Sequence, residues 1–294
     1  MTRLKNKILI TTASLLLMSG VALAQDEGGT GDGSGEGDGS GSGSASGDAT
    51  ATTPAGDATV SASGDMGDAG WPMAIIDRPL TLKASMIGAQ AQLGIAHVDL
   101  GMLGSSTSEG LNVGADYGVS DVLQIGASYG LTLNEFEAKG PVNAHLLYRL
   151  AHGKLKVAAD AAFDYDLNSK NGGISLGAEV HYNLAPNVAV FTPGYQLNLG
   201  VIRDMGDGPI TLAVPVGVAL QANPNIYAWV STQVASFSIS NSANVYISDI
   251  TPATIGAFYS ASNKLDIGVA ANFFDLQNAS DLWAITVGAR IFKM

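Results

Sequence analysis

The chain has 294 residues, with 14 Lys and Arg against 26 Asp and Glu, 37 Gly and no Cys. The formal net charge of -12 argues against a nucleic-acid partner, because phosphate binding needs clustered Lys and Arg. The lack of Cys excludes a disulfide framework, a Cys-ligated metal site and a thiol nucleophile. Only 14% of the residues are charged and the mean hydropathy is positive, which is unusual for a soluble acidic protein.

Residues 1–24 have the pattern of a secretory signal peptide. Three basic residues precede an apolar stretch over 8–18, and Ala22 and Ala24 supply the small residues of a cleavage site. The apolar stretch is short against the roughly 20 residues that a spanning helix needs. We therefore expect Sec-dependent export with cleavage near Ala24.

Residues 25–70 consist almost entirely of Gly, Ser, Asp, Ala and Thr, as in GGTGDGSGEGDGSGSGSASGD. This segment has too little apolar surface to offset the entropy lost when a chain becomes ordered. We therefore expect a disordered linker. It holds nine acidic residues and no basic one, so much of the net charge belongs to it. Calcium binding is an alternative, but neither the EF-hand spacing nor the GGxGxDxUx repeat is present.

The third zone, 71–294, alternates between apolar and polar residues. In 111–119 Leu, Val, Ala, Tyr and Val occupy the odd positions, while Asn, Gly, Asp and Gly occupy the even ones. Segments 122–133, 155–167 and 174–184 repeat this pattern. A period of two indicates β-strands with one apolar and one polar face, and the zone has no apolar run long enough for a membrane helix.

We predict twelve strands, each about the 9–11 residues, or slightly more, that a tilted membrane strand requires. They lie at roughly 85–97, 110–119, 122–133, 141–150, 154–167, 174–184, 188–200, 209–221, 226–238, 248–260, 265–276 and 281–292. Tight turns alternate with longer links such as 98–109, so hairpins with one tight rim and one loose rim are expected. Pro193, Pro215 and Pro252 fall inside proposed strands, where bulges or shifted boundaries are expected.

The positions of the aromatic residues indicate which face lies outside. A soluble sandwich also alternates, with its apolar side inward, and is kept as an alternative. Here aromatic residues gather near both ends of the apolar faces, as at the two headgroup interfaces of a membrane. The predicted aromatic girdle consists of Tyr117, Tyr129, Tyr148, Phe163, Tyr165, Tyr182, Tyr195, Tyr259, Phe273 and Trp283.

This architecture, with the export signal, resembles the porin-like outer-membrane β-barrel proteins of Gram-negative bacteria. The resemblance covers 71–294 and rests on architecture rather than on a diagnostic motif. It implies an all-β, transmembrane, up-and-down antiparallel barrel with periplasmic termini, contact with outer-membrane lipid, and insertion by the barrel-assembly machinery. Such proteins usually end in an aromatic residue, whereas here Phe292 is third from last and lies on the polar face.

Some barrels of this kind are hydrolases, so we searched for their residues. Barrel phospholipases and deacylases use a His and a Ser two positions apart, and none of His97, His145, His152 and His181 has that neighbour. Only His97-Val98-Asp99 resembles a fragment of a barrel protease. We predict no catalytic, cofactor-binding or metal-binding residues, and a hydrolase is kept as a second alternative.

Charged residues on the polar faces predict the character of the lumen. The lumen-facing candidates are Asp116, His145, Arg149, Lys156, Asp160, Asp164, Asp166, Glu179, His181, Asp266 and Arg290. Their acidic excess favours cations, while Arg149, Lys156 and Asp160 are placed for cross-strand ion pairs. We predict a passive channel for small polar or cationic solutes; the first alternative is a structural or surface-interaction barrel without transport. Residues 71–80 are apolar enough to enter the periplasmic mouth or to lie at the membrane interface.

Overall fold

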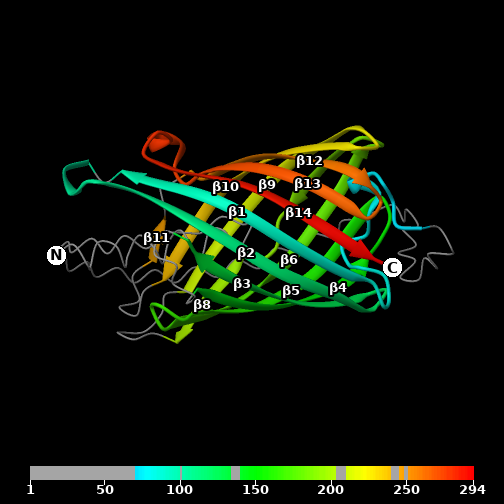
Figure 1. The fold of residues 1–294 in the computed structure, drawn as a ribbon, viewed down its shortest axis with the longest axis horizontal. Helices are drawn as coiled ribbons and strands as arrows, with labels where there is room; N and C mark the ends of the chain where they lie inside the picture. The colour runs from blue at the N-terminus through cyan, green and yellow to red at the C-terminus, as the bar shows by residue number, and fades with distance from the viewer. Residues whose placement is uncertain (1–69, 100, 134–139, 203–209, 240–244, 248–250) are drawn as a thin grey trace, which may run out of the picture.

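The computed structural model describes residues 70–99, 101–133, 140–202, 210–239, 245–247 and 251–294. These residues form a closed antiparallel β-barrel with twelve strand positions (Figure 1), which confirms the predicted fold. The predicted signal peptide and all of the linker except Gly70 lie outside the described residues. In the described part of the chain no helix is long and apolar enough to cross a membrane.

The strands follow one another around the barrel as antiparallel neighbours. They are β1 (Ile87–Asp99), β2 (Ser105–Ser120), β3 (Leu123–Thr132), β4 (Pro141–Ala151), β5 (Leu155–Asp166), β6 (Asn171–Ala185), β7 (Val188–Thr192), β8 (Leu197–Ile202), β9 (Ile210–Asn223), β10 (Ile226–Ile239), β11 (Val245–Ile247), β12 (Ala253–Ser262), β13 (Leu265–Phe273) and β14 (Leu282–Lys293). The 3-10 turns are η1 (Ile75–Asp77), η2 (Gly101–Leu103) and η3 (Leu276–Asn278). Strand β14 pairs with β1 and closes the ring. Strands β7 and β8 share one position between β6 and β9, and β11 and β12 share another beside β10.

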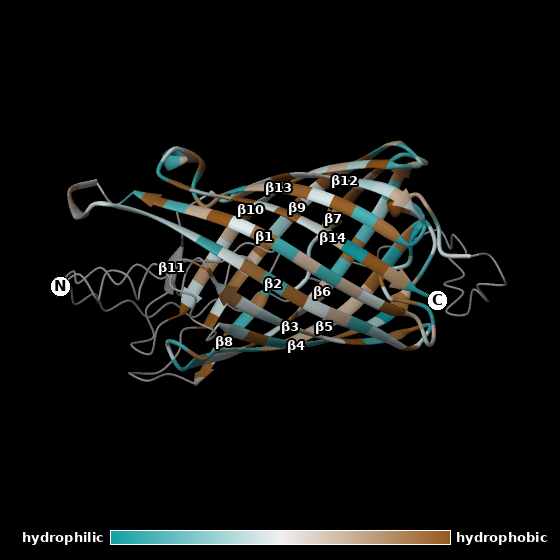
Figure 2. Ribbon diagram, viewed as in Figure 1, coloured by the Kyte–Doolittle hydropathy of each residue, from teal (hydrophilic) through white to brown (hydrophobic). Residues whose placement is uncertain are grey.

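Hydropathy alternates along each strand (Figure 2), and the apolar residues of the strands are the exposed ones. Ile125 and Val287 are 45% and 52% exposed, whereas the inward Asn112 is 2% exposed. The same pattern recurs around the barrel, so the exterior is far more apolar than a soluble monomer tolerates. An apolar exterior around a polar interior is the arrangement of a transmembrane barrel, and it excludes the soluble sandwich.

The tight rim is confirmed. Two or three residues join the strands at 121–122, 152–154, 186–187, 224–225 and 263–264. At the opposite rim the predicted loop 98–109 is wrong, because β1 continues to Asp99 and β2 begins at Ser105. The sequence there loses its apolar period, but a hairpin ladder outside the lipid needs only backbone hydrogen bonds.

The predicted strand 188–200 is interrupted between β7 and β8, because Pro193 has no N–H for the ladder. The side chain of Gln196 fills the gap: its Nε2 donates to Ala178 O at 2.8 Å and its Oε1 accepts from Ala178 N at 2.7 Å. A side-chain amide therefore stands in for a strand residue opposite Ala178. At this position the chain departs from a regular barrel wall.

The other two prolines are accommodated differently. Pro215 remains within β9, and the partner strand β10 has a register shift between Gln233 and Ala235 opposite it. Thr251 and Pro252 belong to the predicted strand 248–260 but lie just before β12, and positions 248–250 of that prediction lie outside the described residues. The Pro252 carbonyl accepts a hydrogen bond from Thr232 Oγ1 at 2.8 Å. The expected bulge and the expected boundary shift are both present.

Candidate functional site

Residues 71–86, here called the mouth segment, cross the interior of the barrel at the tight rim. In Figure 1 the segment, drawn in cyan, lies at the same end as the C-terminus. On one side Trp71 packs against Phe292, with ring centroids 5.5 Å apart. On the other side Ile76, 3% exposed, packs against Tyr227 on β10. Of the two predicted places for 71–80, the structure shows the mouth, and the inward Phe292 is part of its seat.

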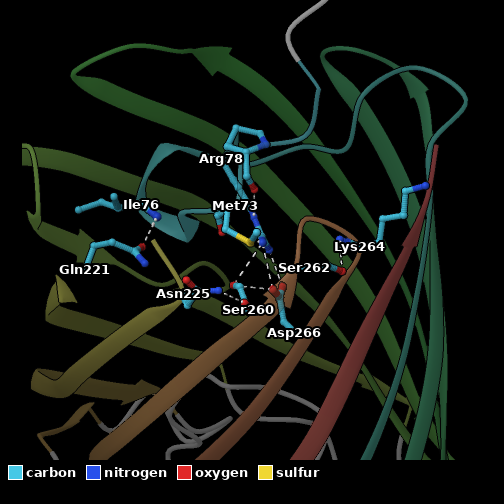
Figure 3. Close-up of polar contacts among 10 residues, drawn as sticks. Met73, Ile76, Arg78, Gln221, Asn225, Ser260, Ser262, Lys264 and Asp266 are labelled. Atoms are coloured by element: carbon cyan, nitrogen blue, oxygen red, sulfur yellow. Dashed lines mark hydrogen bonds and ion pairs between the residues drawn. The ribbon is translucent and has the colours of Figure 1, made fainter. Parts of the chain in front are cut away.

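A buried ion pair fixes the centre of the mouth segment (Figure 3). Arg78 binds Asp266 on β13 with both terminal nitrogens, and the two side chains are 7% and 2% exposed. Ser260 Oγ donates to Asp266 Oδ1 at 2.7 Å, while Arg78 Nε donates to Pro72 O at 2.9 Å and Nη2 to Met73 O at 3.0 Å. A buried charge is tolerated only when it is paired and hydrogen-bonded, and this guanidinium meets both conditions.

Three other strands bind the backbone of the segment through side chains. Lys156 Nζ donates to the carbonyls of Ile76 and Arg78. Gln124 Oε1 accepts from Leu82 N at 2.9 Å, and Gln221 Oε1 accepts from Ile76 N at 3.0 Å. The segment is therefore attached to β3, β5, β9 and β13, and these anchors surround the mouth.

Gly118 shows how closely the segment approaches the wall. Ser85 N donates to Gly118 O at 2.7 Å, and Gly118 N donates to Met86 O at 2.9 Å. A Cβ atom at Gly118 would lie 2.0 Å from Lys83 O, so this approach requires glycine. This glycine of the polar face thus makes room for the mouth segment.

A cavity of about 500 Å³ lies inside the barrel, and the mouth segment contributes Trp71, Ile75, Arg78 and Leu82 to its lining. Seven of the predicted lumen-facing residues line it. They are Asp116, His145, Asp160, Glu179, His181, Asp266 and Arg290. Counting Arg78, the lining holds four carboxylates and two guanidinium groups, and one of each is consumed by the Arg78–Asp266 pair.

The other four predicted residues lie outside this lining. Lys156 binds backbone carbonyls of the mouth segment. The Nη1 atom of Arg149 has no hydrogen-bond partner among the described residues. Asp164 Oδ1 accepts from Asn143 Nδ2 at 2.7 Å. Asp166, 3% exposed, accepts from Asn168 N at 2.8 Å in the turn that follows β5.

The ion pairs expected among Arg149, Lys156 and Asp160 do not form. Lys156 Nζ donates instead to the carbonyls of Ile76 and Arg78, which are distant in the sequence. Asp160 Oδ1 accepts from Tyr195 N at 2.9 Å. The positive charges of Arg149 and Lys156 lie near His152 in the turn that follows β4. Burial, reinforced by these two charges, lowers the pKa of His152 from its ordinary value.

Two histidines approach carboxylates within the lumen. His145 Nε2 lies 2.7 Å from Asp116 Oδ1, and His181 Nε2 lies 3.2 Å from Glu179 Oε1. A Cβ atom at Gly126 would lie 2.3 Å from both Asp116 Oδ1 and His145 Nε2, so this glycine makes room for the first contact. Both pairs lie on β2 to β6.

The other side of the lumen carries four aromatic residues that the sequence analysis missed: Phe191, Tyr227, Trp229 and Phe258. Three of these rings lie against glycines of neighbouring strands. An added Cβ would come within 2.4 Å of Phe191 at Gly217, and within 2.3 Å of Trp229 at Gly256 and of Phe258 at Gly268. The alternation of the sequence could have predicted that these rings face inward, since Tyr227 and Trp229 alternate with the outward Ile226 and Val230.

Five members of the predicted girdle are exposed on the outer surface: Tyr117, Tyr148, Phe163, Tyr182 and Tyr259. Tyr129, Tyr165, Phe273 and Trp283 are half-buried in their strands. Tyr195 does not belong to the girdle, because the break after Pro193 places it in the lining of the interior cavity. Its φ of 62° reflects the sharp turn there.

The side chains of His97 and Asp99 make contacts within their own hairpin and with β14. Its ring stacks on Trp283, with centroids 5.5 Å apart, and Nδ1 lies 3.0 Å from Thr107 Oγ1. Asp99 Oδ1 accepts from Gly101 N at 2.8 Å and shapes the hairpin turn. The described residues contain no group of three or more His, Cys, Asp or Glu that could hold a metal ion.

A closed barrel with an apolar exterior and a charged lumen defines the class of transmembrane β-barrel proteins. Among solved structures, the chain is similar to a NanC porin, with a TM-score of 0.53 and 10% identity over 70% of this chain and 100% of that one. It is also similar to a KdgM porin, with a TM-score of 0.49 and 7% identity over 69% and 98% of the chains. No family model and no curated protein sequence matches the chain. The likeness to the NanC porin shows the fold alone.

Proposed function

We propose that this chain is an outer-membrane barrel that lets small polar or cationic solutes pass, with the mouth segment closing its periplasmic end. The observation that carries the proposal is the lining of the interior cavity. Outside the Arg78–Asp266 pair, Asp116, Asp160 and Glu179 face a single guanidinium, that of Arg290. A narrow lumen with this excess attracts cations and repels anions.

The orientation follows from the rims. Barrels in the outer membrane have short periplasmic turns and longer outer loops, so the tight rim and both ends of the barrel domain face the periplasm. The mouth segment then closes the periplasmic side. Solutes pass when the segment moves aside, and Arg78 and Lys156 set the free energy of that movement.

Planar-bilayer recording tests the proposal. The purified mature protein should carry a K⁺ current whose reversal potential in a KCl gradient indicates cation preference. Replacing Asp116 and Asp160 by Asn and Glu179 by Gln should shift that potential toward the non-selective value. The matched control is Asp164→Asn, which removes an inward acid outside the cavity lining and should leave the potential unchanged.

A second candidate is a structural barrel without transport, and the firmly attached mouth segment favours it. Recordings of a variant lacking residues 71–84 separate the two candidates. Current in this variant but not in the intact chain identifies the segment as a gate. Absence of current from both proteins contradicts the channel and supports the structural function. The engaged His97 and the lack of a His-Ser pair at hydrolase spacing favour a barrel without enzymatic activity.

A further inference from the structure

The interior wall has two chemically different halves at the level of the cavity. The polar half, on β1 to β6, presents Asp116, Asp160 and Glu179, whereas the aromatic half, on β7 to β12, presents Phe191 and Trp229. Phe191 and Trp229 pack beside the cluster of Ile76 and Tyr227, and both rings also line the cavity. Rings facing carboxylates across a lumen are suited to a solute with an apolar body and a positive charge.

The two halves meet through direct contacts where β6 pairs with β7. The Phe191 ring lies 5.3 Å from the His181 ring, and His181 Nε2 is 3.2 Å from Glu179 Oε1. An aromatic surface and a carboxylate are thus connected through a single histidine. This junction offers both kinds of contact that a cation with an apolar body needs.

Asp160 supplies an independent indication. Its side chain is 6% exposed and lines the cavity. Oδ1 is held by Tyr195 N at 2.9 Å, but Oδ2 is buried without a hydrogen-bond partner. An unpartnered buried carboxylate oxygen is costly, and a cation in the cavity would compensate it.

At the Phe258 end of the aromatic half, a cationic side chain of the protein already occupies the ring face. Arg290 lies over Phe258, with 5.0 Å between its guanidinium carbon and the ring centroid. A second cation would be repelled there, so the site is confined to the end of the aromatic half nearest Glu179. Trp229 stacks on Phe258, with ring centroids 5.1 Å apart, and also contacts the ring of Tyr227.

We propose that the lumen holds a binding site for organic ammonium ions with an apolar body, formed by Trp229 and Phe191 on one side and Glu179 and Asp160 on the other. The proposal rests on the cation preference proposed above and names the class of solute. The apolar body lies on the rings, and the ammonium group faces the carboxylates. Arg290 excludes the reverse orientation.

Isothermal titration of benzyltrimethylammonium into the intact mature chain in detergent tests the site, with empty micelles as blank. Trp229→Leu, which keeps an apolar side chain, and Glu179→Gln should each weaken binding about tenfold, as expected for loss of a partly desolvated cation–π or charge contact. Asp164→Asn should bind like the intact chain. Heat-dependent migration in gels verifies that each variant is folded.

Benzyl alcohol, the neutral probe, should bind at least tenfold more weakly than the cation, and benzenesulfonate should not bind. Equal affinity for alcohol and cation, unchanged affinity in both variants, or no binding to the intact chain overturns the site. Titration requires no current, so the two proposals fail separately. Binding without K⁺ current in either the intact chain or the variant lacking residues 71–84 overturns the channel and leaves the site. K⁺ current without binding overturns the site and leaves the channel.

Discussion

The polar and the aromatic half of the lumen hold the same mouth segment by different means. The polar half offers Gln124 and Lys156, which bind backbone groups of the segment. The aromatic half offers Tyr227 as an apolar seat for Ile76, and the neighbouring β13 offers Asp266 as the partner of Arg78. Hydrogen bonds to the backbone are indifferent to side-chain identity, whereas the ion pair requires Arg78, so the second attachment specifies the sequence of the segment.

Arg78→Ala should have the largest effect on this attachment. It leaves Asp266 buried without its partner, which costs about 3–5 kcal/mol. We expect the segment to leave the mouth, so trypsin should cleave after Lys83 much faster than in the intact chain. Arg290→Ala is the control, because Arg290 has no hydrogen bond or ion pair to the segment among the described contacts. Equal cleavage rates in the two variants would refute the role of the ion pair.

Gln196→Leu should have the next largest effect, and it acts on the wall where the two halves meet. Both the N–H and the C=O of Ala178 lose their partner, at about 1–3 kcal/mol for each buried group. We expect a lower midpoint of urea unfolding in detergent and faster hydrogen exchange at Ala178. Gln196→Glu keeps the acceptor for Ala178 N but sets a carboxylate oxygen against Ala178 O and Pro193 O, so it should not recover the loss. An unchanged midpoint in Gln196→Leu would show that the amide does not support the wall.

Lys156→Met tests the polar half alone. Two carbonyls of the segment lose a charged donor, so the closed state should lose about 1–3 kcal/mol. Trypsin cleavage after Lys83 should accelerate, but less than in Arg78→Ala, because the ion pair persists. Faster cleavage in Lys156→Met than in Arg78→Ala would reverse the ranking of the two halves.

Adding one methyl group to either half should act locally and should leave the attachment of the mouth segment unchanged. Gly256→Ala displaces the Trp229 ring and Gly126→Ala displaces the His145–Asp116 contact, each at about 1–3 kcal/mol. Only Gly256→Ala should shift the Trp fluorescence maximum, and only this variant should weaken binding of benzyltrimethylammonium. A similar loss of binding in both variants would mean that the halves are not chemically distinct.

Much of the barrel could be predicted because alternation is a local property. A residue of a strand faces opposite to its neighbours, so Leu111 to Val119 reveal both faces without knowledge of any partner. Tight turns then set the number of strands. The prolines indicated where the prediction would fail, and Pro193 and Pro252 did shift strand boundaries.

The site was harder to predict because it depends on contacts between distant residues. Arg78 and Asp266 are 188 positions apart, and no local pattern connects them. Phe292 looked anomalous because it lies on the polar face so close to the end of the chain, and its packing against Trp71 explains that inward position. Lys156 looked like a partner for Asp160, but its Nζ donates to two backbone carbonyls of the mouth segment instead.

The sequence by itself determined a barrel of twelve strand positions, its apolar exterior and its acidic lumen, because each follows from side-chain order along single strands. The tertiary structure alone decided where residues 71–86 lie, which acids are neutralised and which half of the lumen is aromatic. These features arise when strands far apart in the chain are brought side by side around the ring. The free energy of burying Arg78 or Trp71 depends on those neighbours and not on the local sequence.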